Sequence, residues 1–283
     1  MNKIFGVVEG FYRRPYTFGQ RSELIDFLSD LGLNTYIYGP KSDVYHRKNW
    51  RKPYPRKKLA EFRELVKLSH KRKIHFIYAL SPVHDPELSG VITKIDTLRQ
   101  AGIRHFSLFF DDIRVRLSKT TAEIQLLIAN GLYEHLSRDS DDFMLSFCPT
   151  QYRGFKKTAY IKHITENLHP KIDIFWTGKR VVSPKITGKD VDTITRLLCR
   201  PVLIWDNLFA NDYIPGKIHR FPYHDRDAQI IGKVRGIVIN PMNNFSPSRP
   251  LIFTSALYFR APQKYDPATA WTQAQKYLVK DDD

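Results

Sequence analysis

The chain has 283 residues, of which 42% are hydrophobic and 13% aromatic, which is enough apolar material for a large core and excludes a disordered chain. No apolar run approaches the roughly 18 residues that cross a bilayer, and the N-terminus lacks the pattern of a signal peptide. The formal net charge of +16 attracts polyanions, but no nucleic-acid motif accompanies the basic residues, so nucleic-acid binding is not expected as the main role.

Short apolar segments typical of strands recur along the chain. In order they are residues 4–8, 35–38, 75–80, 105–110, 143–147, 172–176, 201–205 and 236–239. Their starts lie 29 to 40 residues apart, the length of a strand and a crossover helix. Several lack polar alternation, as expected of strands that are covered on both faces.

The intervals between these segments have the periodicity of helices. Residues 21–31 carry Leu24, Phe27, Leu28 and Leu31 on one stripe, and residues 57–68 carry a similar one. Gly32 and Gly102 stand where a helix should end before the next strand. Residues 267–279 predict an additional helix packed on the outside.

Eight such units predict a single (β/α)8 barrel of the TIM type over residues 1–283. A doubly wound open sheet is the main alternative, but neither GxGxxG nor GxxxxGK[ST] follows a strand. With two cysteines, Cys148 and Cys199, and no Cys or His cluster of zinc spacing, we expect a cytosolic protein with no metal or other cofactor.

In such a barrel the chemistry lies where the strands end. The residues just past the predicted strands are rich in carboxylates, amides and hydroxyls: Glu9, Gly10, Pro40, Lys41, Ser81, Pro82, Asp111, Asp112, Pro149, Thr150, Tyr152, Thr177, Gly178, Asp206, Asn207, Asn240 and Pro241. With Trp205 and Tyr152 as flat apolar walls, this makeup is typical of a carbohydrate site.

The segment FFDDI, residues 109–113, places two acids directly after a strand. A single Asp there would favour a helix N-cap, but two neighbouring carboxylates in a partly dry pocket favour catalysis. We expect one of them to keep its proton near neutral pH and act as a general acid.

Adjacent acids also limit the mechanism. A retaining glycosidase with a protein nucleophile takes its two carboxylates from separate elements that flank the scissile bond. Neighbouring acids instead suit a substrate that brings its own nucleophile, such as a 2-acetamido oxygen.

Nine segments resemble the catalytic barrel of glycoside hydrolase family 84, the retaining β-N-acetylglucosaminidases that include protein O-GlcNAcases. They are GVVEGFY (6–12), LNTYIYGPKSD (33–43), YHRKNWRKPYP (45–55), FIYALSP (76–82), FSLFFDDI (106–113), FCPTQY (147–152), WTGKRVVSPKI (176–186), LIWDNLFANDY (203–213) and GIVINP (236–241). The resemblance implies substrate-assisted hydrolysis of terminal β-linked GlcNAc through an oxazoline, on a glycan, glycopeptide or glycoprotein.

The resemblance also implies residue roles. Asp111 would orient and polarise the 2-acetamido group, and Asp112 would be the general acid and then the base. The substrate-binding residues would be Gly6 through its backbone, Lys41, Tyr152, Trp205, Asn207, Asp212 and Asn240.

The chain departs from the family pattern at several positions. Arg13 and Tyr16 replace Gly and Trp of GFYGRPW, Gly39 and Ser42 replace Ala and Asp, Gln151 replaces Glu, and Met242 replaces Asn. None removes a proposed catalytic group. The sequence does not determine the shape of the pocket mouth, the identity of the aglycone or the oligomeric state. The N- and C-terminal domains of larger family members are not expected in this minimal barrel.

Two other functions stay in play. One is a related glycosidase with a different 2-acetamido sugar or leaving group. The other is a GlcNAc-binding barrel that has lost turnover and docks on acidic partners through its basic surface, densest between Arg47 and Lys73.

Overall fold

The computed structural model describes residues 3–281, and its eight strands form one closed parallel barrel in sequential order. The strands are β1 (Ile4–Glu9), β2 (Thr35–Tyr38), β3 (His75–Leu80), β4 (His105–Phe109), β5 (Leu145–Cys148), β6 (Asp173–Trp176), β7 (Leu203–Asp206) and β8 (Gly236–Ile239). Pairing of β8 with β1 closes the ring, so no strand edge is left open. The predicted barrel is confirmed, and the open sheet is excluded.

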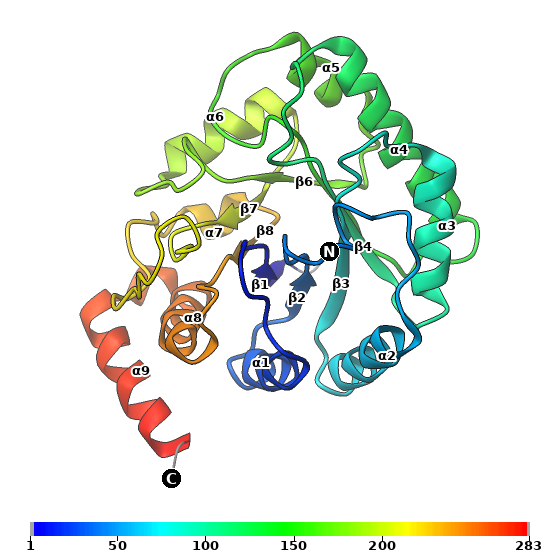
Figure 1. The fold of residues 1–283 in the computed structure, drawn as a ribbon. Helices are drawn as coiled ribbons and strands as arrows, with labels where there is room; N and C mark the ends of the chain where they lie inside the picture. Colours follow the sequence, from blue (N-terminus) through cyan, green and yellow to red (C-terminus); the bar gives the residue numbers. More distant parts are fainter. Residues whose placement is uncertain (1–2, 282–283) are drawn as a thin grey trace.

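Helices surround the barrel, with one after each strand (Figure 1). They are α1 (Phe18–Asp30), α2 (Arg56–Lys71), α3 (Leu88–Arg99), α4 (Lys119–Ser137), α5 (Ala159–Asn167), α6 (Gly188–Leu198), α7 (Ile230–Lys233) and α8 (Phe245–Arg260). Gly32 and Gly102 have φ of 70° and 91°, as expected of residues that follow a helix end. None of the helices described is long and apolar enough to cross a membrane.

A further helix, α9 (Pro267–Asp281), lies outside the ring, at the red end of the ribbon in Figure 1. The Tyr277 ring packs against Phe253 of α8 at 5.0 Å and against Phe27 of α1 at 6.2 Å between centroids. Ala270 and Ala274 are buried in the same contact. The predicted additional helix is therefore present and packed on the outside.

Some predicted strand limits were wrong by one or two residues. The fifth strand begins at Leu145 and ends at Cys148, and the seventh begins at Leu203. Apolar sequence alone cannot fix these limits, because pairing with the neighbouring strand decides them. The pairing of β5 with β4 begins with Leu145 opposite Phe106. Pro201 also has no N–H to donate to a neighbouring strand.

Apolar side chains fill two layers. One cluster, which includes Ile37, Ile77, Phe175 and Val238, fills the barrel interior, and a larger one lies between strands and helices. The cavity described below opens at the carboxyl ends of the strands, where the tilted rings of Trp205 and Phe109 of the inner cluster lie 4.7 Å apart between centroids. The face at the carboxyl ends of the strands thus rests on a packed interior.

His105 lies at the opposite end of the barrel, at the start of β4, and gives the fold a dependence on pH. Its Nδ1 accepts the Met144 N–H at 3.2 Å, which requires a neutral ring. Burial, aided by nearby His75, lowers the pKa of His105 to about 4. The unfolded chain, with a His pKa of about 6.5, therefore takes up this proton first as pH falls.

We expect the free energy of unfolding to fall between about pH 6.5 and pH 4, with His105 contributing on the order of 2 kcal/mol of that loss. Asn at position 105 keeps an acceptor for the Met144 N–H and cannot take up the proton. His105→Asn should therefore flatten the pH dependence in urea titrations, whereas His70→Asn on the exposed face of α2 should not. Equal slopes for the wild type and His105→Asn would contradict this assignment.

Candidate active site

A cavity of about 440 Å³ opens among the carboxyl ends of the strands, within the size range of small-ligand sites. Its lining includes Asp111, Asp112, Tyr152, Trp205, Asn207, Asp212 and Asn240 from the predicted site, together with Gly10, Tyr12, Cys148, Thr177, Val181, Val182, Ala210 and Tyr213. Six loops or strand ends contribute, so the closed barrel brings together residues that lie up to 230 positions apart in sequence.

Lys41 holds one oxygen of Asp111. The Lys41 Nζ lies 2.6 Å from Asp111 Oδ2, and both side chains are buried. Lys41 also lies 5.1 Å from the centre of the Phe109 ring and 5.4 Å from that of Trp205. Asp111 Oδ1 is buried without a hydrogen-bond partner among the described residues, so one acceptor is left for a ligand.

Asp112 is held by two tyrosine hydroxyls. Tyr152 Oη donates to its Oδ1 at 2.7 Å, and Tyr12 Oη donates to its Oδ2 at 2.9 Å. The φ of 53° at Asp112 interrupts the extended backbone, in which consecutive side chains point to opposite faces. This local turn allows two adjacent acids to line one cavity.

The expectation that one of these acids keeps its proton does not hold for Asp112 in the ligand-free site. Burial acts to raise the pKa of Asp112, but the Tyr152 hydroxyl, the Lys41 ammonium and the Tyr12 hydroxyl outweigh it and lower that pKa. The expectation considered only repulsion between the two acids. The structure adds a cation and two donors, which stabilise the charged form.

Gly10 lines the cavity, whereas Gly6 does not. Gly6 lies within β1 opposite Thr35 of β2, and a Cβ there would stand 1.8 Å from the Thr35 carbonyl oxygen. At Gly10 a Cβ would stand 2.2 Å from the indole ring of Trp205. The glycine that approaches the site is therefore the second of the GVVEG motif, and the assignment of Gly6 to the substrate is corrected.

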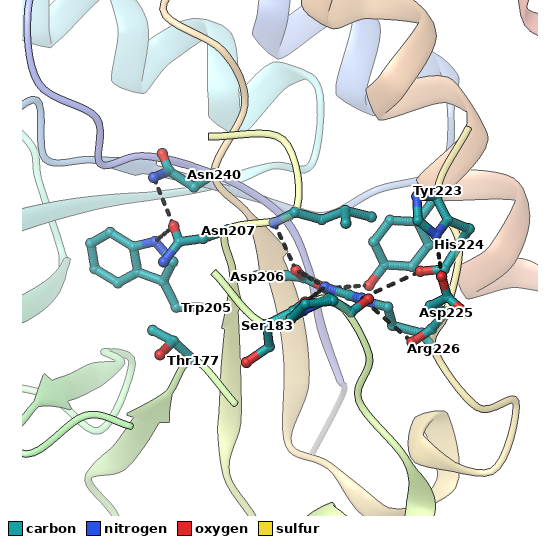
Figure 2. Close-up of polar contacts among 12 residues, drawn as sticks. Thr177, Ser183, Trp205, Asp206, Asn207, Tyr223, His224, Asp225, Arg226 and Asn240 are labelled. Atoms are coloured by element: carbon teal, nitrogen blue, oxygen red, sulfur yellow. Dashed lines mark hydrogen bonds and ion pairs between the residues drawn. The ribbon is translucent and has the colours of Figure 1, made fainter. Parts of the chain in front are cut away.

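An ion pair buried behind the site fixes the end of β7. Arg226 Nε and Nη2 donate to the two oxygens of Asp206 at 2.7 and 2.6 Å, and Tyr223 Oη donates to Oδ2 at 2.7 Å (Figure 2). Arg226 Nη2 also donates to the Ser183 carbonyl at 3.0 Å, which ties in the loop after β6. This network holds Trp205 and Asn207, on either side of Asp206, toward the cavity.

Asn207 joins three walls of the cavity. Its Oδ1 accepts from Trp205 Nε1 and from Asn240 Nδ2, both at 2.9 Å (Figure 2), and its Nδ2 donates to the Val181 carbonyl at 2.8 Å. Asn240 Oδ1 in turn accepts the Gly10 N–H at 3.2 Å. The two amides are therefore oriented before any ligand binds.

Asp212 connects the loops after β7 and β1. Its Oδ2 accepts the Tyr12 N–H at 2.7 Å, and its main-chain carbonyl accepts from Arg13 Nε at 2.6 Å. Because the same contact positions Tyr12, Asp212 indirectly orients a hydroxyl that holds Asp112. No group of three or more acidic, His or Cys side chains suited to a metal ion occurs in the part of the chain that the structure describes.

Comparisons with known proteins identify the family of this chain. The family model described as beta-N-acetylglucosaminidase matches residues 5–283. The chain belongs to this family, glycoside hydrolase family 84. Two proteins named Protein O-GlcNAcase, from Rattus norvegicus and Mus musculus, are each 34% identical to it over 277 residues, covering 91% of this chain and 30% of theirs.

A solved structure of a mutant of the Thermobaculum terrenum O-GlcNAc hydrolase superposes with a TM-score of 0.91 at 32% identity. It matches 98% of this chain and 63% of that one. The chain therefore corresponds to a part of these family 84 relatives, and the matched part contains the barrel.

Two departures from the family 84 pattern contact each other. Tyr16 Oη donates to the Met242 carbonyl at 2.6 Å, and both side chains are buried behind the cavity wall. Gln151 stays within its own loop, where its Nε2 donates to the Lys156 carbonyl and its Oε1 accepts from the Thr158 hydroxyl. None of the three lines the cavity.

Tyr12, Cys148 and Arg47 were not among the predicted site residues. Tyr12 lies two residues beyond the motif glycine, and Cys148 is the last residue of β5. Arg47 donates to the main-chain carbonyl of Asp112 at 3.0 Å. The position of Cys148 at a strand end was a usable signal, whereas Tyr12 and Arg47 reach the site only through the course of their loops.

Removing one donor from Asp112 should raise its pKa. Tyr12→Phe deletes the hydroxyl that stabilises the carboxylate, so the pKa should rise relative to the wild type, as read from the carboxyl carbon in pH titrations of ¹³C-aspartate-labelled protein. Tyr213→Phe is the matched control, because Tyr213 lines the same cavity without bonding to Asp112. An unchanged Asp112 titration in Tyr12→Phe would refute this role.

Proposed function

We propose that the protein is a retaining exo-β-N-acetylglucosaminidase that removes terminal β-linked GlcNAc by substrate-assisted catalysis. The observation that carries the proposal is the pair of unequal acids. Asp111 has one oxygen bound to Lys41 and one buried oxygen without a partner among the described residues, and Asp112 beside it is held by two hydroxyls. The first suits a fixed acceptor and the second a group that exchanges protons.

In the first step, the acetamido N–H of the bound sugar donates to Asp111 Oδ1. The negative charge of Asp111 then increases electron density on the acetamido oxygen, which attacks the anomeric carbon. Asp112 gives a proton to the glycosidic oxygen as the bond to the aglycone breaks, and an oxazoline forms as its nitrogen proton passes toward Asp111. In the second step Asp112, now a carboxylate, removes a proton from water as the water oxygen bonds to the anomeric carbon. The bond from that carbon to the oxazoline oxygen breaks, and the proton shared with Asp111 returns to the nitrogen, which restores the acetamido group.

The low pKa of Asp112 in the free protein is compatible with this role. A bound sugar excludes water from the carboxylate, and the Tyr152 hydroxyl turns from Asp112 to the acetamido oxygen. Both changes raise the pKa of Asp112, so the acid takes up its proton as the substrate binds. The Trp205 ring, held by Asn207, walls the pocket around the acetyl group, and Asn207, Asp212 and Asn240 hold the sugar hydroxyls and the acetamido region.

The relatives named Protein O-GlcNAcase and O-GlcNAc hydrolase favour a GlcNAc-bearing protein or peptide as the substrate. We further propose that residues 1–283 act as one catalytic domain without a cofactor. A reducing compartment such as the cytosol fits the two free thiols, Cys148 and Cys199.

The two acids should respond differently to substitution. Asp112→Asn removes the proton donor, so kcat/KM for a peptide-linked GlcNAc should fall by about 10²- to 10⁴-fold, and that for an activated aryl glycoside far less. Asp111→Asn should slow both substrates, because assistance by the acetamido group is needed whatever group leaves. Exposed Asp141, changed to Asn, serves as the control.

Steady-state kinetics on the two substrates check this division of roles. Equal losses on both substrates in both variants would contradict it. A wild-type protein that binds GlcNAc but turns over neither substrate would favour the binding barrel instead.

The identity of the nucleophile has a separate test. Mono-, di- and trifluorination of the acetyl group withdraw electron density from the attacking oxygen, so kcat should fall progressively along a series with one leaving group. A thiazoline mimic of the cyclic intermediate should inhibit at concentrations well below the substrate's KM. Rates indifferent to fluorine, or a glycosyl ester trapped on the protein, would rule out the acetamido group as nucleophile.

A further inference from the structure

Basic residues occur in most of the loops that form the mouth of the cavity. Five of them lie in five different loops: Arg13 after β1, Arg47 after β2, Arg114 after β4, Arg153 after β5 and Arg180 after β6. Four stand within two residues of a cavity-lining residue, and Arg47 donates to the main chain of both catalytic acids. We call these five side chains the cationic rim.

Most of the rim charge is not neutralised by the protein. Arg114, Arg153 and Arg180 are exposed, and within the described residues their guanidinium groups make no ion pair or hydrogen bond. The loops after β1, β5 and β6 contain no Asp or Glu. The carboxylates that line the cavity are Asp111, Asp112 and Asp212, so acidic lining residues alternate along the chain with basic residues of the neighbouring loop positions.

Arg13 is held at the mouth in a backbone conformation that favours glycine. Its φ is 74°, and glycine is the common residue of the family pattern at this position. Its Nε donates to the Asp212 carbonyl, while Nη1 and Nη2 have no partner among the described residues. The backbone at Arg13 is therefore strained, and its guanidinium is held beside Asp212 with two of its nitrogens available to a ligand.

Apolar side chains lie between the rim cations. Tyr12, Val181 and Tyr213 line the cavity and are 40%, 40% and 54% exposed. The group that leaves the sugar departs toward this mouth. A leaving group of mixed character, with carboxylates near apolar side chains and main chain, complements such a surface better than a uniformly charged polymer does.

The basic stretch from Arg47 to Lys73 is not one surface at the site. It begins in the rim and continues as α2 on the outside of the barrel. There Lys58 pairs with Glu61 and Lys67 with Glu64, at 3.0 Å in each case. The net charge is therefore divided between the outer helices and the mouth, and only the mouth can contact an aglycone.

We propose that the cationic rim selects GlcNAc-bearing peptides with acidic residues on either side of the glycosylated Ser or Thr. This proposal rests on the proposed hydrolase function and names the aglycone of that same site. Contacts between the rim arginines and the carboxylates of the peptide are exposed to solvent. Each therefore raises kcat/KM by a factor of about two to three, and three together raise it roughly tenfold.

The test compares three GlcNAc-Ser peptides of one length, with Asp and Glu, Asn and Gln, or Lys beside the glycosylated residue. The wild-type kcat/KM should be about tenfold higher for the acidic peptide than for the neutral one at 50 mM salt. The lysine peptide should be the poorest of the three. By roughly 500 mM salt the difference should nearly vanish, because screening lengths fall from about 10 Å at 0.1 M to 3 Å at 1 M.

Two triple variants locate the effect. R114Q/R153Q/R180Q should lower the ratio of acidic to neutral kcat/KM from about ten to about three or below, the factor that the remaining Arg13 can contribute. R63Q/R138Q/R196Q removes the same charge from the outer helices and the far end of the barrel, and should keep the wild-type ratio. The ratio of acidic to neutral kcat/KM is measured within each variant, so a smaller amount of folded protein does not change it. The lysine peptide tests the charge preference of the rim without any substitution in the protein.

Equal kcat/KM for the three peptides would overturn the proposal that the rim selects acidic peptides. An equal loss of the ratio of acidic to neutral kcat/KM in both triple variants would overturn it as well. A sulfated oligosaccharide that competes as strongly as an acidic peptide of equal charge would also overturn it, since the rim would then bind any polyanion. The aryl GlcNAc glycoside separates the two hypotheses. If it is not hydrolysed, the hydrolase function fails, and fluorescence anisotropy with the labelled peptides then tests the rim by binding alone.

Discussion

Three carboxylates lie buried at the carboxyl ends of the strands, and each has one cation within hydrogen-bonding distance. Glu9 ends β1 and bonds to Arg21 of α1, Asp206 ends β7 and bonds to Arg226, and Asp111 follows β4 and bonds to Lys41. A buried charge without a partner costs several kcal/mol, so these pairs constrain where the loops of this face can run. The cavity opens between the loops that these ion pairs position.

The hydrogen bonds of these carboxylates separate support from chemistry. Glu9 accepts twice from Arg21, from the Tyr16 N–H and from the Tyr36 hydroxyl, so both of its oxygens are satisfied. Asp206 is satisfied by Arg226, Tyr223 and the Leu208 N–H. Asp111 alone of the three keeps a buried oxygen without a partner among the described residues. Burial and pairing by themselves would not distinguish them, but unmet acceptor capacity does.

The two neighbouring acids differ because their surroundings differ. Asp111 faces a rigid ammonium that is itself packed over two aromatic rings. Asp112 lies at a left-handed turn and faces two hydroxyls, which can donate to it or turn to a ligand. A fixed charge and an adjustable one thus stand side by side, as a reaction requires when one acid orients the substrate and the other transfers protons.

The amino-acid sequence by itself determined the architecture and the location of the site. Eight apolar segments at intervals of 29 to 40 residues specify strand and helix units, and closure of a parallel barrel brings every strand end to one face. The acids of FFDDI and the amides at positions 207 and 240 could therefore be placed near one another from pattern alone. Local periodicity is enough for this, because it sets which residues each strand presents at its end.

Only the tertiary structure decided what those residues experience. Lys41 precedes Asp111 by 70 positions and Tyr12 precedes Asp112 by 100. Both residues help to lower the pKa of Asp112, whereas repulsion between neighbouring acids alone predicts that one of the two keeps its proton. The choice of Gly10 over Gly6 likewise depends on the Trp205 ring, which arrives from β7. A pKa, a close approach or a charged rim depends on distances of a few ångströms between remote segments, and the packing of the whole barrel sets those distances.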